Sequence, residues 1–176
     1  MLKFATGNDN KLREAQEILG IALEKADVGD LDEIQTVSVE ELIRRKAYDA
    51  YVVAGEPVMV EDTGLSFDAW NGLPGALIKW FLKSVHNEWI LQMLAGYEDR
   101  RATALCFVAS YNGKDYKIAS GKVRWMISAE CRGENGFGWD DIFIPEGTDK
   151  TFAQMSASEK NAFSMRRRAF ENFAKL

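Results

Sequence analysis

Residues 102–127 read ATALCFVASYNGKDYKIASGKVRWMI, and this stretch decides the fold. Ala102–Tyr111 is apolar on both faces, which is typical of a strand in the middle of a sheet. Asn112-Gly113 is a hairpin turn signal, and Asp115–Ile127 is expected to return as a long strand. Because strands alternate with helices upstream, the pattern predicts an α/β fold with a mixed central sheet flanked by helices.

The remaining elements follow from apolar spacing and end signals. We expect strands at Leu2–Ala5, Ile21–Ala26 and Val58–Val60, the last leading into a tight turn at Thr63-Gly64. Helices are expected before Gly20, after a capping box of Ser38 and Glu41, and twice between Gly75 and Gly96. One last helix is expected to start at a second box, Ser156 with Glu159, and to run nearly to residue 176.

Length and charge restrict the function classes. The 176 residues suit one domain covering 1–176, and the net charge of -5 disfavours a nucleic-acid binder. No membrane span is expected, because Glu56 and Glu61 interrupt the longest apolar region. Cys106 and Cys131 are far apart, as expected of free thiols in a reducing compartment. Met1–Phe4 shows no signal peptide, so we expect a cytoplasmic protein.

Two segments suggest phosphate and metal chemistry. Thr6-Gly7-Asn8 and Lys11 lie between a strand and a helix, where backbone amides and a lysine suit an anion, although an ordinary turn explains them equally well. Glu61-Asp62 follows a buried strand, and adjacent carboxylates on an extended chain point opposite ways, so we expect them to have different jobs. Asp62, with Glu33 as a second carboxylate, suits magnesium; the alternative is a solvated acidic turn.

Two later segments suggest a site for a base. Gly133–Asp140 interleaves glycines with Phe137 and Trp139, which could cover a base while Asp140 accepts hydrogen bonds; a loop packed on the core is the alternative. In the last helix, Arg166 lies on the same stripe as Phe163 and Phe170. An inward guanidinium needs a partner, which could be an anionic ligand or an internal salt bridge.

Other reaction types lack the residues they need. The only histidine, His86, has no nucleophile motif nearby and is expected to link two helices or start one. A Ser-His-Asp or Cys-His mechanism is therefore hard to build, and ligand-spaced Cys and His for zinc are absent from the sequence. Carboxylates and lysines remain, which suit metal-assisted phosphoryl chemistry.

The motifs, in their order, resemble the inosine triphosphate pyrophosphatases, also called XTP/dITP diphosphatases, and most closely their archaeal and eukaryotic branch. The matching segments are Thr6-Gly7-Asn8 with Lys11 and Glu14, Glu33-Ile34-Gln35, Lys46-Ala47, Val60–Leu65, Gly72–Gly75, Ile78–Phe81, Phe137–Asp140 and Glu159–Ala162. The resemblance covers almost the whole chain, and several ordered motifs are more specific than any one alone.

The resemblance implies two lobes around a nucleotide-binding cleft, a homodimer, and Mg2+-dependent hydrolysis of ITP, dITP and XTP to monophosphate and pyrophosphate. It makes Asp62 the general base or a metal carboxylate and Glu33 a second magnesium ligand. Thr6, Asn8, Lys11, Lys46 and Lys79 would hold the triphosphate, Phe137 would stack on the base, and Trp139, Asp140, Lys160 and Arg166 would frame it. Gly7, Thr63, Gly138 and Met165 complete the expected substrate-binding set.

Three positions depart from the family pattern. Met165 stands where histidine is usual, Asp141 where proline is usual, and Gln154 where glutamate is usual. Methionine cannot donate a hydrogen bond to a 6-keto oxygen, so the departure at Met165 predicts weaker discrimination between hypoxanthine and adenine.

Other functions are open at the level of sequence. They are a nucleotide-binding protein that has lost catalysis, a pyrophosphatase of relaxed base specificity or one acting on modified pyrimidines, and a nucleic-acid module built on Arg166–Arg168. Retention of the carboxylates and lysines argues against the first, and the net charge of -5 argues against the last.

Overall fold

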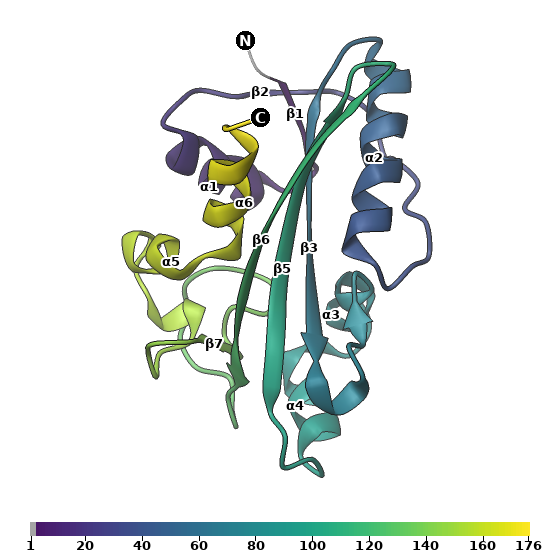
Figure 1. Ribbon diagram of the computed structural model, residues 1–176. Helices are drawn as coiled ribbons and strands as arrows, with labels where there is room; N and C mark the ends of the chain where they lie inside the picture. The colour runs from purple at the N-terminus through teal and green to yellow at the C-terminus, as the bar shows by residue number, and fades with distance from the viewer. Residues whose placement is uncertain (1–2) are drawn as a thin grey trace.

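A seven-stranded mixed sheet organises the computed structural model, which describes residues 3–176 (Figure 1). The strands are β1 (Lys3–Ala5), β2 (Glu24–Lys25), β3 (Met59–Phe67), β4 (Pro74–Gly75), β5 (Arg101–Tyr111), β6 (Tyr116–Ile127) and β7 (Phe143–Pro145). Their order is β2-β1-β3-β5-β6-β7, with β4 paired to β3. Strand β1 is parallel to β2 and β3, and the other pairs are antiparallel, so the predicted mixed sheet is confirmed.

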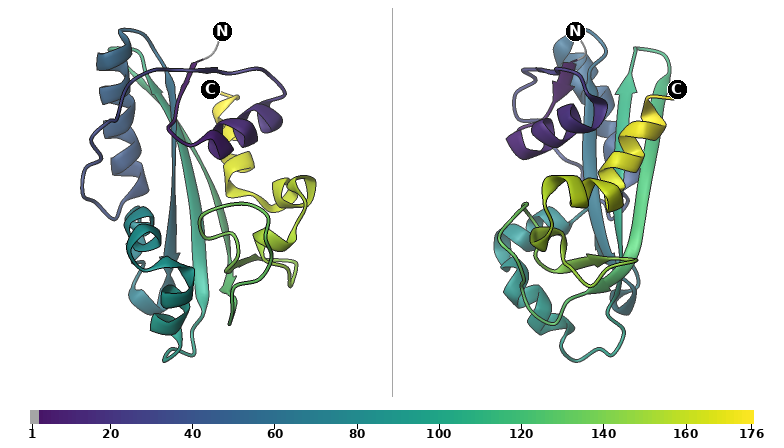
Figure 2. Two further views of the ribbon diagram at one scale, coloured as in Figure 1. Left: turned by 180° about the vertical axis from the view of Figure 1, so that it is seen from behind. Right: turned by 90° about the vertical axis from the view of Figure 1, so that its left-hand side faces the viewer.

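Helices cover the sheet on both faces. They are α1 (Asp9–Leu19), α2 (Val39–Ala54), α3 (Ile78–Ser84), α4 (His86–Leu94), α5 (Ala157–Phe163) and α6 (Met165–Phe173), with short 3-10 turns at Asp68–Trp70 and Phe152–Gln154. In Figure 1, α1, α5 and α6 lie on one side of the long strands and α2 on the other; the right-hand view of Figure 2 shows α6 crossing β6. No helix among residues 3–176 is long and apolar enough to cross a membrane.

Two main apolar cores follow from the alternation of side chains along β5. Cys106 and Val108 face a core that also contains Phe4, Ile90 of α4 and Phe170 of α6. On the opposite face, Ala109 packs with Ile43, Ala47 and Val60 beneath α2. The hairpin strand was therefore correctly predicted to be buried on both faces, and it separates the two cores.

The predicted tight turn at Thr63-Gly64 is wrong. Strand β3 continues to Phe67, because it pairs with β5 from Val60 opposite Ala109 to Phe67 opposite Ala102. A Cβ at Gly64 would lie 2.4 Å from Cγ2 of Val39, at the start of α2. The glycine thus allows a close approach of α2 to the strand, and Asp62 stands within a strand.

The predicted single last helix is also wrong. It divides into α5 and α6 at Ser164, whose backbone is extended (φ -65°, ψ 130°) and whose hydroxyl accepts hydrogen bonds from the N–H groups of Arg166 and Arg167. The capping box of Ser156 and Glu159 is confirmed. Helical spacing continues across the break, so the pattern of apolar residues did not reveal it.

The other elements agree with the predictions or differ at their ends. Helix α1 ends at Gly20 as predicted, α3 and α4 meet at His86, and the hairpin joins β5 to β6. Ser38 caps α2, but the Glu41 carboxylate accepts a hydrogen bond from the Thr36 hydroxyl instead of completing a box. Strand β2 covers only Glu24–Lys25 of the predicted Ile21–Ala26, and Leu2 of the first predicted strand lies outside the described residues.

We predict that Gly121→Ala destabilises the fold by displacing α6. A Cβ at Gly121 would lie 2.0 Å from the carbonyl oxygen of Met165 and 2.6 Å from the nitrogen of Ala169, both backbone atoms. Overpacking of this kind lowers the free energy of unfolding by about 1–3 kcal/mol, which denaturant titration measures. Gly96→Ala, with nothing within 4 Å of its Cβ, is the control. Equal stability of both variants and the wild type would show that α6 does not contact β6 this closely.

Candidate active site

One pocket of about 730 Å³ collects almost all of the site residues predicted from the sequence. Its walls come from the β1–α1 turn, the loop over residues 26–33, α2, β3, α3, the loop over residues 137–140 and the start of α6. The predicted residues that line it are Thr6, Gly7, Asn8, Lys11, Glu33, Lys46, Asp62, Thr63, Lys79, Phe137, Gly138, Trp139, Asp140, Met165 and Arg166. Lys160 lies behind this lining, in contact with the Phe137 ring, at 4.9 Å from its centre.

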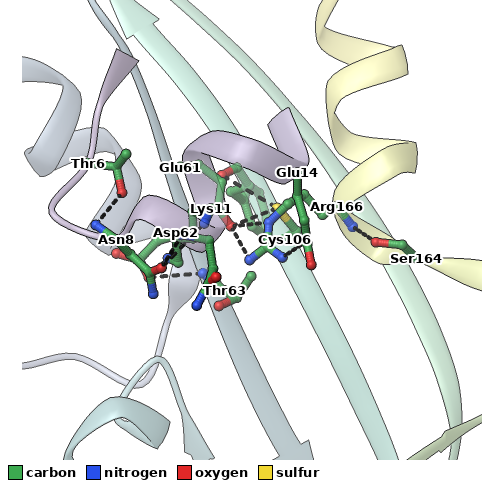
Figure 3. A network of polar contacts seen from close by, with 12 residues as sticks. Thr6, Asn8, Lys11, Glu14, Glu61, Asp62, Thr63, Cys106, Ser164 and Arg166 are labelled. Carbon is green, nitrogen blue, oxygen red and sulfur yellow. Dashed lines mark hydrogen bonds and ion pairs between the residues drawn. The ribbon is translucent and has the colours of Figure 1, made fainter. Parts of the chain in front are cut away.

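The β1–α1 turn is shaped by its own side chains. Asn8 caps α1, since its Oδ1 accepts hydrogen bonds from the N–H groups of Asn10 (3.0 Å) and Lys11 (3.3 Å). The Thr6 hydroxyl in turn accepts from the N–H of Asn8 at 3.1 Å. This arrangement directs Lys11 into the pocket, where its Nζ lies 3.1 Å from Glu61 Oε2 and 3.6 Å from Asp62 Oδ1 (Figure 3).

Two carboxylates and three lysines meet at one end of the pocket. Asp62 Oδ2 lies 2.7 Å from Lys46 Nζ, which is also 3.6 Å from Glu33 Oε1. Lys79 Nζ lies 2.8 Å from the other oxygen of Glu33. Burial favours the neutral form of Asp62, but Lys11 and Lys46 outweigh it and hold the pKa of this carboxyl well below its usual range. Asp62 is therefore ionised at neutral pH.

Arg166 belongs to the wall of the pocket, is almost wholly buried, and has two carboxylate partners. Its side chain is 2% exposed, and it donates hydrogen bonds to Glu14 and, at 3.2 and 3.3 Å, to Glu61 (Figure 3). The thiol of Cys106 contacts the same Glu61 oxygen at 3.2 Å. Burial is the largest single influence and would raise the pKa values of Glu14 and Glu61. The charge of Arg166, together with Lys160 for Glu14 and with Lys11 for Glu61, outweighs it and lowers both pKa values. The internal salt bridge considered from the sequence is thus present, while Arg166 still lines the pocket.

A continuous chain of ion pairs connects this buried group to the lysines. Lys160 Nζ lies 2.8 Å from Glu14 Oε1 and 2.7 Å from Asp140 Oδ2, which extends the network to the loop of Phe137. We call the whole set the ion-pair chain. In order it contains Asp140, Lys160, Glu14, Arg166, Glu61, Lys11, Asp62, Lys46, Glu33 and Lys79, five anions alternating with five cations at contacts of 3.6 Å or less.

Glu14 and Glu61 were not among the predicted site residues. Glu14 follows Lys11 by three residues and precedes Ile18 by four, so helical spacing places it on the buried stripe of α1. A buried acidic residue needs a cationic partner, so the position of Glu14 in the sequence could have identified it as a member of the site. Glu61 is buried beneath α6 whereas Asp62 lines the pocket, so the two neighbouring side chains lie in different surroundings, as expected of adjacent residues on an extended chain.

The aromatic residues of the 133–140 loop separate into two environments. The Phe137 ring faces the pocket, with Arg166 Cζ 5.4 Å from its centre, and the Asp140 carboxylate accepts a hydrogen bond from the Phe137 N–H at 2.8 Å. Trp139 is only 6% exposed and packs on Phe143 and Phe152, with ring centres at 5.5 and 6.4 Å. For Trp139, the alternative considered from the sequence is therefore correct: this side chain packs on the core.

Comparison with known proteins agrees with this geometry. A model of the Ham1 family matches residues 2–176. The chain belongs to the Ham1 family. A protein of Yarrowia lipolytica named inosine triphosphate pyrophosphatase is 46% identical, over 96% of this chain and 90% of its own length. A dITP/XTP pyrophosphatase of Methanopyrus kandleri is 42% identical, over 97% and 93%. The solved structure of a HAM1 protein from Coxiella burnetii has a TM-score of 0.87 and 30% identity, covering 99% of this chain and 98% of that one.

We predict that Glu14→Gln strongly destabilises this Ham1 family chain. The variant removes one of the two carboxylates that neutralise Arg166 and one of the two that contact Lys160. Breaking a buried ion pair costs about 3–5 kcal/mol, measurable by denaturant unfolding at pH 7. The control Glu171→Gln removes the exposed partner of Arg167 and costs less than about 1 kcal/mol. Similar costs for both variants would contradict the assigned role of the ion-pair chain.

Proposed function

We propose that this chain hydrolyses deaminated purine nucleoside triphosphates, namely ITP, dITP and XTP, to the monophosphate and pyrophosphate. One observation carries the proposal: a single pocket holds lysines and carboxylates at one end and an aromatic ring beside a buried guanidinium at the other. A triphosphate suits the first end and a purine base the second. The names of the two relatives above support this reading.

The lysine end suits the triphosphate. Lys11, Lys46 and Lys79 come from three different helices and converge on the carboxylates of Asp62 and Glu33. Ammonium groups in this arrangement can bind several phosphate oxygens at once. The N-terminal end of α1 adds the partial positive charge of its backbone.

Asp62 and Glu33 would hold Mg2+. Both supply hard oxygen atoms that contact Lys46, so a single cationic position already lies between them. Two carboxylates suit magnesium, which is usually held by one or two carboxylates together with phosphate and water. When bound, the metal would neutralise phosphate charge and polarise the phosphoanhydride. The low pKa of Asp62 suits a metal ligand better than a general base.

The aromatic end suits a keto-purine. Phe137 offers a ring face for stacking. Arg166 can only donate hydrogen bonds, so it favours an oxygen at position 6 of the purine over the amino group of adenine. Its two carboxylates fix the guanidinium in place before a base arrives, which reduces the ordering cost of recognition.

Two further proposals concern assembly, for which the family resemblance is the ground, and location, for which the sequence is the ground. We propose that the chain acts as a homodimer, which sedimentation equilibrium would report as twice the chain mass. We also propose a cytoplasmic location, consistent with the two free cysteines, of which Cys106 is buried.

The direct test is a substrate panel. Purified protein with magnesium would be incubated with ITP, dITP, XTP, GTP and ATP, and the products resolved by anion exchange. We expect monophosphate and pyrophosphate from the first three and loss of turnover after chelation of the metal. Binding of all five without turnover would instead favour a nucleotide-binding protein that has lost catalysis.

Asp62→Asn is expected to lower kcat for ITP at least about 100-fold, because it removes the charged carboxylate that would hold Mg2+ against the reacting phosphates. The measurement is initial rate at saturating ITP and magnesium. The control is Asp115→Asn, in the β5–β6 hairpin outside the pocket. Full activity of Asp62→Asn would remove this carboxylate from the mechanism.

Met165 makes relaxed base specificity a specific second candidate. Its side chain is 2% exposed, lines the pocket and neighbours Arg166, but it offers no hydrogen-bond donor. We predict that Met165→His raises the ratio of kcat/KM for ITP over ATP by about 10-fold or more, on the scale of one buried hydrogen bond. An unchanged ratio in a folded variant would show that Met165 does not limit discrimination.

A further inference from the structure

Asn87 is a buried polar residue that the ion-pair chain does not use. It lies in the first turn of α4 and is 8% exposed. Its amide nitrogen donates hydrogen bonds to the carbonyl oxygen of Gly138, at 2.7 Å, and to the carboxylate of Asp141. Both N–H bonds of the amide are therefore used, and both acceptors belong to the segment that carries Phe137.

The Asn87 amide is not there merely to fill space. Its Oδ1 is buried without a hydrogen-bond partner, which costs about 1–3 kcal/mol. The amide cannot be reversed to relieve this cost, because reversal would set its oxygen against the Gly138 carbonyl oxygen, which can only accept a hydrogen bond. An apolar side chain of similar size would avoid the cost, so the two donated hydrogen bonds are what distinguish asparagine at this position.

The loop over residues 133–141 has its other attachments elsewhere. The backbone N–H and side-chain amide of Asn135 donate to Ala153 and Met155, and Asp140 accepts from the N–H of Ala153. These contacts tie the loop to the segment before α5. Among the hydrogen bonds of the described residues, those of Asn87 alone join the loop to α4.

The Asn87 contacts also affect how the phosphate end and the base end of the pocket lie relative to each other. A Cβ at Gly138 would lie 3.8 Å from Leu82 Cδ1, so the loop rests on α3 next to the point where Asn87 holds it. Helix α3 carries Lys79 of the phosphate end, and the loop carries Phe137 of the base end. The distance between phosphate and base groups therefore depends on how the loop sits against α3 and α4.

We propose that Asn87 and Asp141 are positioning residues that hold the loop over residues 133–141 against α4 and thereby set the Phe137 ring for base binding. The inference rests on the proposed function in taking Phe137 as the surface for the base.

The test combines loop dynamics with two probes of the pocket. Hydrogen exchange would be measured over residues 133–141, and calorimetry would give Kd for IMP, which carries a base, and for inorganic tripolyphosphate, which does not. For Asn87→Ala we expect faster exchange in the loop and an IMP Kd about tenfold higher, which is the scale of the net contribution of one hydrogen bond. Tripolyphosphate affinity is expected to stay within about twofold, because the lysine end is untouched.

Matched variants separate positioning from a general loss of structure. Asp141→Asn keeps an acceptor for Asn87 and is expected to retain most of the IMP affinity, whereas Asp141→Ala is expected to lose part of it. Gln92→Ala, on the exposed face of the same helix, is the control and should match the wild type.

Three outcomes would overturn the inference: unchanged loop exchange in Asn87→Ala, faster exchange with unchanged IMP affinity, or an equal loss of affinity for both probes. Wild-type protein that turns over no deaminated purine triphosphate would overturn the proposed function. The exchange measurement would still decide whether Asn87 holds the loop, so the two failures are distinguishable.

Discussion

Arg166 is a cation that this fold buries almost completely, and the pocket is arranged around the need to neutralise it. An unpaired guanidinium in a protein interior is prohibitively costly, so Glu14 of α1 and Glu61 of β3 must lie beside α6. These contacts fix α1 and α6 relative to the sheet. Lys11 lies on α1 and Asp62 lies on β3. The contacts that fix these two elements therefore also fix the positions of Lys11 and Asp62 at the proposed phosphate end of the pocket.

The ion-pair chain gives the pocket a character different from that of a simple basic anion site. Each lysine already has a carboxylate partner, so a polyanion must compete with an internal anion for every ammonium group. A nucleotide that arrives with a divalent cation meets less competition, since the cation can compensate Asp62 and Glu33. The proposed metal and the proposed phosphate contacts are thus energetically coupled.

The sequence predicted local features well and partnerships poorly. Helical spacing correctly predicted that the Arg166 side chain points inward. The mixed sheet was correctly predicted from one hairpin and the strands before it. The partners of Arg166 could not be assigned, because Glu14 and Glu61 are 152 and 105 residues away. The error at Thr63-Gly64 had a similar origin: a glycine that usually marks a turn here admits Val39 from a distant helix. Local patterns carry no information about such contacts, and only the assembled fold reveals them.

The long sequence separation between Glu14 and Arg166 has a consequence for biosynthesis. On the ribosome, α1 and β3 emerge well before α6, so during most of translation Glu14 and Glu61 have no guanidinium to pair with. The pocket therefore forms only late, when α6 packs against the completed sheet. A nascent chain stalled before residue 165 would be a substrate for quality control rather than a partly active enzyme.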